Sequence, residues 1–188
     1  MFGLRNKTDF NNDVVRYGPI GENRLKEILS DKGHRFEDVG ENPDFRLFDV
    51  DIIQIDSPDV SINDVLEAYR GNRNTPSSAV SYEVKSDTFG YISRNIVYEV
   101  VSNTNPGCLA RSKADFLYYV FLDRKEQIKE EFLINVNKLR WWLTCNFSAV
   151  NKSEYLKAKS MRRNVDNTAI LLINIDKLIE DKVASKLK

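Results

Sequence analysis

Four charged side chains in two short segments have the types and spacing needed for metal-dependent chemistry. Asp49 and Asp51 are separated by one residue, and so are Glu83 and Lys85. Because side chains alternate between the faces of a strand, each pair projects from one face. If the two strands are neighbours, a carboxylate of the first comes within reach of Glu83. Two close carboxylates repel each other, so both stay ionised readily only where a cation bridges them or water screens them.

This combination suits the hydrolysis of a phosphodiester. The reaction needs an activated water, neutralisation of the charge that develops on the phosphate, and a stabilised leaving oxygen. Mg²⁺ or Mn²⁺ held by carboxylates supplies much of this, and a neighbouring ammonium orients or deprotonates the water or contacts the phosphate. Asp51, Glu83 and Lys85 provide these groups. The alternative is an ordinary solvated strand face on which Glu83 and Lys85 form an ion pair.

The same residues belong to a longer pattern that resembles the PD-(D/E)XK phosphodiesterase superfamily, in particular its small bacterial and phage members. The resemblance runs from Gly21 to about Phe121. It is carried by Gly21-Glu22, residues 32–36, the acidic segment 49–53, the signature 82–87, residues 94–99, and residues 107–116, which end in Ser-Lys-Ala-Asp-Phe.

The resemblance implies a restriction-endonuclease-like fold and a role for each matching residue. Asp51 and Glu83 would be metal ligands, Val84 would offer its backbone carbonyl, and Lys85 would be the catalytic lysine. Glu22 would be a helix-borne acid that reaches the site. The implied cofactor is Mg²⁺ or Mn²⁺ and the implied substrate is DNA. Asp49 competes with Asp51 for the ligand role, and Asp51 is preferred because the residues around it match the family's strand better.

Other polar and aromatic residues are candidates for binding the nucleic acid. Adjacent residues on a helix point in different directions, so we expect one of Trp141 and Trp142 to be in the core and only the other to be free to stack on an unpaired base. Charged helix surfaces and loops explain the basic candidates equally well. Those candidates are Arg94, Arg111, Lys113, Arg162 and Arg163.

The composition limits the other possibilities. A chain of 188 residues can bury one core, so we expect residues 1–188 to form a single domain. The 28 basic and 28 acidic residues balance, so net charge says nothing about nucleic-acid binding. Cys108, Cys145 and the single histidine, His34, lack zinc-ligand spacing. No apolar stretch is long enough to cross a bilayer. We expect a cytoplasmic protein with no membrane partner, either a monomer or a homodimer.

The elements that must position these residues predict an α/β fold with a central mixed sheet flanked by helices. Residues 21–33 predict a helix that ends at a glycine. The β-branched composition predicts strands at 35–39, 47–55 and 80–85, with 91–92 and 95–101 as further strands of the same sheet. Residues 56–78 are interpreted as an insertion with a short helix, placed to act as a lid or flap. Residues 112–122 suit either a helix or a strand. The remainder predicts a polar connection starting at 126–132, a helix at 136–144, a strand at 168–175 and a charged C-terminal helix.

Three other functions remain open at this stage. A protein of the same fold could bind or assemble on DNA without cutting it, although a site that had lost catalysis would have no chemical reason to keep both acids and the lysine. An RNA-processing nuclease could use the same site. A plain α/β interaction domain is the third alternative.

Overall fold

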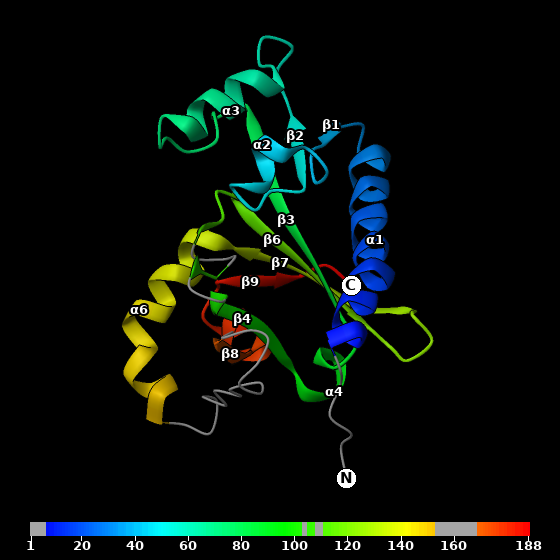
Figure 1. Ribbon diagram of the computed structural model, residues 1–188, viewed down its shortest axis with the longest axis vertical. Coiled ribbons are helices and arrows are strands. Elements are labelled where there is room, and N and C mark those ends of the chain that lie inside the picture. Colours follow the sequence, from blue (N-terminus) through cyan, green and yellow to red (C-terminus); the bar gives the residue numbers. More distant parts are fainter. Residues whose placement is uncertain (1–6, 103–104, 108–110, 153–168) are drawn as a thin grey trace.

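The computed structural model describes residues 7–102, 105–107, 111–152 and 169–188, and these form a mixed α/β fold (Figure 1). The central sheet contains six strands in the order β1-β2-β3-β6-β7-β9. Pairing is antiparallel throughout, except that β3 and β6 are parallel. The strands are β1 (Arg35–Asp38), β2 (Ile52–Ile55), β3 (Ala79–Asp87), β6 (Phe116–Leu122), β7 (Ile128–Asn135) and β9 (Ala184–Lys186).

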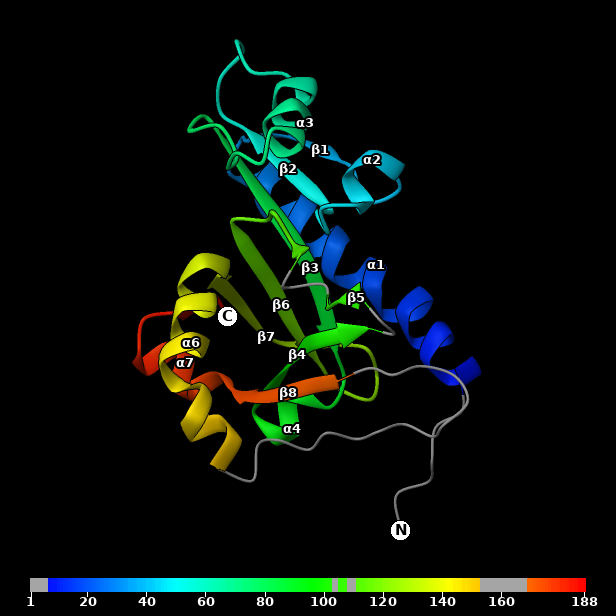
Figure 2. The same ribbon diagram turned by 60° about the vertical axis from the view of Figure 1, so that its left-hand side comes forward.

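One face of this sheet is covered by a single long helix, α1 (Lys7–Asp31), which runs beside β3 (Figures 1 and 2). Leu25 and Leu29 of α1 pack on Tyr82, Val84 and other residues of the sheet. Gly21 permits this close approach, because a Cβ there would lie 2.6 Å from Ser86 Oγ and 2.9 Å from Val84 Cγ1. α1 ends at Asp31, and Gly33, two residues later, has a φ of +74°, which suits a residue without a side chain.

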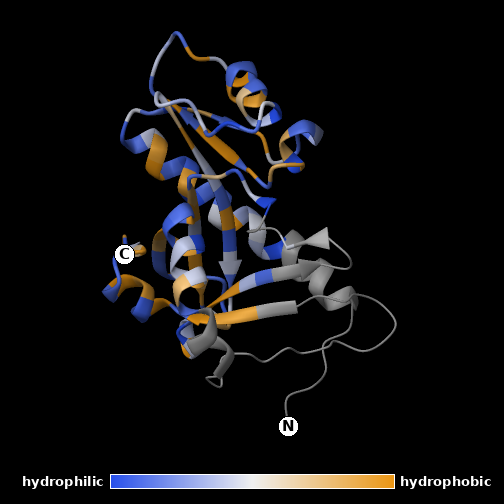
Figure 3. Ribbon diagram, turned by 90° about the vertical axis from the view of Figure 1, so that its left-hand side faces the viewer, coloured by the Kyte–Doolittle hydropathy of each residue, from blue (hydrophilic) through white to orange (hydrophobic). Residues whose placement is uncertain are grey.

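The opposite face carries the larger core and a second, three-stranded sheet in the order β5-β4-β8. The elements on this side are α2 (Pro43–Arg46), α3 (Ile62–Arg70), α4 (Gly90–Ser93), β4 (Asn95–Ser102), β5 (Asn105–Pro106), α6 (Val136–Lys152), β8 (Ala169–Asn174) and α7 (Ile175–Glu180). Of these, α2, α3, β4, α6, β8 and α7 contribute buried apolar residues to one continuous cluster. Figure 3 colours the described residues by hydropathy.

The predicted fold class is confirmed, whereas several element assignments are wrong. α1 begins far earlier than residue 21 and contains Pro19. Residues 91–92 form helix α4 instead of a strand, because the Asp87 carboxylate accepts hydrogen bonds from the N–H groups of Phe89 (2.6 Å) and Gly90 (3.1 Å) and turns the chain. After this turn β4 joins the second sheet and pairs with β8, while β6 takes the position beside β3.

Two further assignments are decided by tertiary contacts. Residues 112–122, left open between helix and strand, form β6 from Phe116 onward. The predicted polar connection at 126–132 is wrong, since β7 begins at Ile128. Its charges are paired within the fold: Tyr118 and Arg24 both contact Glu131, which is 1% exposed.

The segment 56–78 is part of the core. Its helix α3 buries Val65 and Tyr69 in the larger cluster. The Tyr69 hydroxyl lies 3.0 Å from Thr75 Oγ1, which in turn lies 3.0 Å from Ser81 Oγ on β3. These contacts anchor the segment to β3, and the role as a lid or flap stays a prediction. Among the described residues no helix combines the length and apolar character needed to cross a membrane.

Candidate functional site

The pairing of β2 with β3 places Asp51 beside Glu83. The antiparallel register aligns Ile52 with Tyr82, so the residue before Ile52 stands opposite the residue after Tyr82. Directly opposed residues of an antiparallel pair project from the same face. Asp51 comes one residue before β2 begins, and it therefore lies next to Glu83 at the end of the β2–β3 ladder.

The Asp51 carboxylate also fastens the two strands together. Its Oδ2 accepts a hydrogen bond from the backbone N–H of Val84 at 2.7 Å, and the Asp51 N–H donates to the Tyr82 carbonyl at 2.9 Å. In a strand the N–H and C=O of one residue point toward the same edge. The Val84 carbonyl consequently points to the edge on which Asp51 lies.

Glu83 and Lys85 form an ion pair between a buried acid and a half-exposed base. Glu83 is 3% exposed. The Lys85 side chain is 41% exposed, and its Nζ contacts Glu83 Oε1. The pKa of Glu83 is raised to about 7: burial is the largest cause, the Lys85 charge lowers the pKa, and the charges of Asp51 and Asp49 raise it. Such a shift at a cluster of acids is typical of functional sites.

Asp49 joins the same group of acids, in a strained conformation. Its φ is +47°, a region that non-glycine residues rarely adopt. Its Oδ1 is 3.3 Å from Arg111 Nη2, whereas its Oδ2 is buried without a hydrogen-bond partner. Burial raises the pKa of Asp49, the Arg111 and Lys85 charges lower it, and the charges of Asp51 and Glu99 raise it.

Glu22 approaches Asp51 from α1. Burial raises the pKa of Glu22, and the next largest cause is the negative charge of Asp51. Burial likewise raises the pKa of Asp51, which the Lys85 charge and the Val84 hydrogen bond lower. Glu27 points elsewhere on the helix, where it lies 3.2 Å from Arg24. Glu22 thus lies near Asp51, whereas Glu27 pairs with Arg24.

Two residues of this neighbourhood, Lys26 and Asp38, were not identified from the sequence. Lys26 forms an ion pair with Asp38. The Lys26 charge lowers the pKa of both Glu22 and Asp51, and the Asp38 charge raises both. Lys26 follows Glu22 by four positions on α1, so the i, i+4 spacing was the signal available for it. Asp38 ends β1, which a sequence pattern does not place beside Asp51.

The donor groups fit a hard divalent cation. Mg²⁺ and Mn²⁺ prefer carboxylate and carbonyl oxygens, which Asp51, Glu83 and Val84 offer. The unpartnered Oδ2 of Asp49 and the proton affinity of buried Glu83 both indicate negative charge that is incompletely compensated. Within the described ranges no three acidic, histidine or cysteine side chains already surround one point, so binding would require these side chains to adjust.

The cations predicted to bind nucleic acid fall into different environments. Arg111 is exposed beside Asp49, and Lys113 Nζ lies 2.6 Å from Asn72 Oδ1. Arg94 pairs with Asp176 at 2.6 and 3.0 Å and also contacts Glu130, so its guanidinium is committed to joining the layers of the fold. Arg162 and Arg163 lie outside the described residues.

The segment that resembles the family's Ser-x-Ala-Asp-aromatic element supports the acidic strand. Ser112 Oγ donates to the Asp49 carbonyl at 2.9 Å. Asp115 Oδ2 accepts hydrogen bonds from both the N–H and the hydroxyl of Ser81, each at 2.9 Å. These contacts fix the chain just before β6 against β2 and β3, so this segment holds the acids in place.

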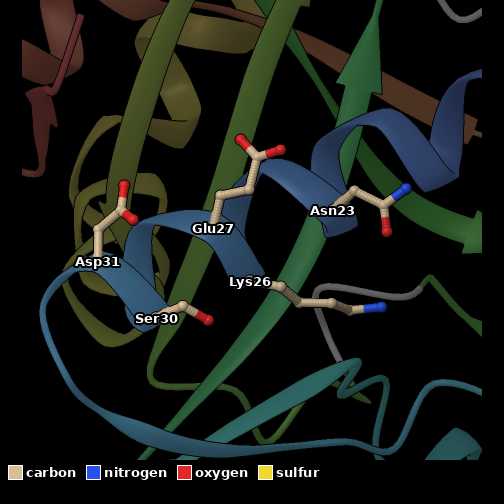
Figure 4. Close-up of a pocket in the computed structure, with 5 residues that line it drawn as sticks. All are labelled: Asn23, Lys26, Glu27, Ser30 and Asp31. Atoms are coloured by element: carbon tan, nitrogen blue, oxygen red, sulfur yellow. The ribbon is translucent and has the colours of Figure 1, made fainter.

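A separate depression lies along the outer side of α1 (Figure 4). It is lined by Asn23, Lys26, Glu27, Ser30 and Asp31, all from this one helix. Lys26 links this depression to the acidic residues near Asp51 through its ion pair with Asp38.

No family model, no curated protein and no solved structure matches this chain.

Proposed function

We propose that this chain is a divalent-metal-dependent nuclease of the PD-(D/E)XK type that hydrolyses DNA phosphodiester bonds. The observation that carries the proposal is the position of Asp51 next to Glu83 at the end of the β2–β3 ladder, with Lys85 in contact with Glu83. Two neighbouring acids and a lysine are the minimum set for this reaction.

The proposed roles follow from position and burial. Asp51, Glu83 and the Val84 carbonyl would hold Mg²⁺ or Mn²⁺, which, when bound, supplies Lewis-acid activation of water and charge neutralisation at the phosphate. Lys85 is exposed enough to meet substrate, and its ammonium would orient the attacking water or contact the phosphate. Glu22, on the other side of Asp51, would accept a proton or hold a water in place.

The pKa of Glu83 supports an exchange of a proton for a cation. With a pKa of about 7, Glu83 binds a proton readily near neutral pH in the absence of metal. A cation held by Asp51 and Glu83 favours the ionised form and so competes with that proton. Metal binding should therefore weaken as the pH falls below 7.

DNA is the proposed substrate, with Arg111 and Lys113 as the cations best placed to contact its backbone. Both lie in the segment fixed against the acidic strand by Ser112 and Asp115. Arg94 is not included, because its ion pairs with Asp176 and Glu130 leave it a structural role. RNA is the alternative substrate.

A cleavage panel tests the proposal. Purified protein is incubated with labelled duplex, single-stranded and branched DNA and with RNA, each in Mg²⁺, Mn²⁺, Ca²⁺ or chelator. We expect DNA cleavage in Mg²⁺ or Mn²⁺ and none in chelator or Ca²⁺, because Ca²⁺ accepts looser coordination and activates water poorly. Equal activity in chelator would contradict a metal-dependent mechanism, and cleavage of RNA alone would correct the substrate.

A further inference from the structure

The two adjacent tryptophans of α6 have different environments. Trp142 packs against the larger core, and its Nε1 donates to Asp181 Oδ2 at 2.6 Å. Trp141 is 71% exposed. Removing an indole from water is favourable, so the exposed ring of Trp141 offers an apolar face to a ligand.

Trp141 lies in a groove between α6 and the turn before β9. The groove is lined by Asn137, Lys138, Trp141, Cys145 and Lys182, among others. Asp181, the acid in the groove, is compensated by the Trp142 N–H and by Lys177 at 3.2 Å. The groove therefore combines the exposed ring with two ammonium groups and two side-chain amides, those of Asn137 and Asn146.

We propose that Trp141 is a stacking platform for an unpaired base of single-stranded DNA, with Lys138 and Lys182 contacting the adjacent phosphates. The flat indole accepts the face of any base, and the two lysines of the groove match the charge of a nucleic-acid backbone. Lys138 Nζ lies 3.2 Å from the Lys182 carbonyl, which holds the two residues together and leaves further N–H donors of Lys138 for a phosphate. The proposal rests on the proposed nuclease function and narrows its substrate to DNA with a single-stranded part.

The platform is attached to the same segment that holds the acidic strand. The Val136 N–H, at the start of α6, donates to the Asp115 carbonyl at 3.0 Å. One turn later, Arg140 donates to the Ser112 carbonyl. Ser112 itself bonds to the Asp49 backbone. These hydrogen bonds link the start of α6 to the segment that carries Asp49. A DNA strand bound at Trp141 would therefore be held at a fixed position relative to the acids.

Binding of a fluorescent twelve-nucleotide oligo(dT) in chelator tests the platform without any cleavage. We expect Trp141→Ala to weaken binding about 10-fold or more, and Trp141→Phe to stay within about threefold of the wild type, since stacking needs an aromatic face. Tyr91→Ala removes another exposed aromatic ring and should leave affinity unchanged.

Two further measurements separate stacking from charge. An oligonucleotide with abasic sites should bind wild type as weakly as oligo(dT) binds Trp141→Ala, and the two losses of affinity should not add. Lys138→Gln should reduce the slope of log affinity against log salt by about 0.7.

Three results would overturn the platform: oligo(dT) bound equally by wild type and Trp141→Ala, no oligo(dT) bound by wild type, or a wild-type dimer that Trp141→Ala converts to a monomer in sedimentation. The last would assign the groove to a second copy of the chain. Because Trp141 is exposed, melting followed by circular dichroism should show Trp141→Ala folded. Binding in chelator is independent of metal-dependent cleavage, so the platform can fail while the nuclease stands, and the reverse.

Discussion

The carboxylate of Asp51 accepts the backbone N–H of Val84 at 2.7 Å, in the middle of the Glu83-Val84-Lys85 signature. The pairing of β2 with β3 stops at Ile52. Just beyond this point the Asp51 side chain accepts the hydrogen bond that a backbone carbonyl would accept in a continuing ladder. The hydrogen bond fixes Asp51 beside Glu83 before any ligand arrives. Asp51 and Glu83 meet although they lie far apart in the sequence, because segment 56–78 returns the chain so that β3 pairs with β2.

Glu83 should make the stability of the metal-free protein depend on pH. Its folded-state pKa of about 7 lies above the ordinary value of 4.5, so the folded state holds the proton more tightly. The free energy of unfolding should therefore decrease as the pH rises from about 4.5 to about 7 and then level off. Chemical denaturation across this range should show a smaller decrease for Glu83→Gln. Parallel curves for the two proteins would show that Glu83 does not titrate as described.

Asp51 and Asp49 should differ as metal ligands. Asp51 stands opposite Glu83, whereas one oxygen of Asp49 is already paired with Arg111. Calorimetric titration with Mn²⁺ should show a loss of about 10-fold or more for Asp51→Asn and a smaller loss for Asp49→Asn, because carboxylate oxygens are the preferred ligands. A larger loss for Asp49→Asn would transfer the ligand role to Asp49.

The buried acid of β7 should be important for stability. Glu131 is 1% exposed and receives hydrogen bonds from Tyr118 (2.7 Å) and Arg24 (3.2 Å). Glu131→Ala leaves both donors without this acceptor, and we expect a cost of about 3 kcal/mol in the free energy of unfolding. Glu27→Ala is the matched control: it removes the exposed partner of the same arginine and should cost less than about 1 kcal/mol. If Glu131→Ala and Glu27→Ala lower the free energy of unfolding equally, the buried contacts of Glu131 add no stability beyond that of an exposed ion pair.

The sequence was sufficient to predict the parts of this fold that depend on local pattern. The pattern of the two acidic segments predicted that a carboxylate of the first would come within reach of Glu83, and Asp51 lies next to it, although the predicted strand 47–55 begins only at Ile52. The rest depended on tertiary contacts. Charged β7 had the composition of a loop, and its charges are accommodated only because distant partners such as Arg24 and Arg94 reach them.

The second sheet was not predictable from the sequence for a related reason. β4 has ordinary strand composition, and nothing in it indicates which sheet it joins. The choice is made by the turn at Asp87 and by Gly90, where a Cβ would lie 2.1 Å from the Phe121 ring. In the same way, the contact of Lys26 with Asp38 depends on how α1 lies against β1.

The most direct test of the central claim is the turnover of Lys85→Ala on DNA in Mg²⁺ or Mn²⁺. Removing the ammonium leaves Asp51, Glu83 and the Val84 carbonyl able to hold the cation, and metal affinity should stay the same or rise because a competing positive charge is gone. Turnover should fall on the order of 10²-fold or more, as expected when a group that orients water or stabilises the phosphate is lost. Lys129→Ala, which removes a lysine paired with Asp123 at 2.9 Å, should cleave at the wild-type rate. If Lys85→Ala also cleaves at that rate, Lys85 is only an ion-pair partner of Glu83 and the proposed active site is wrong.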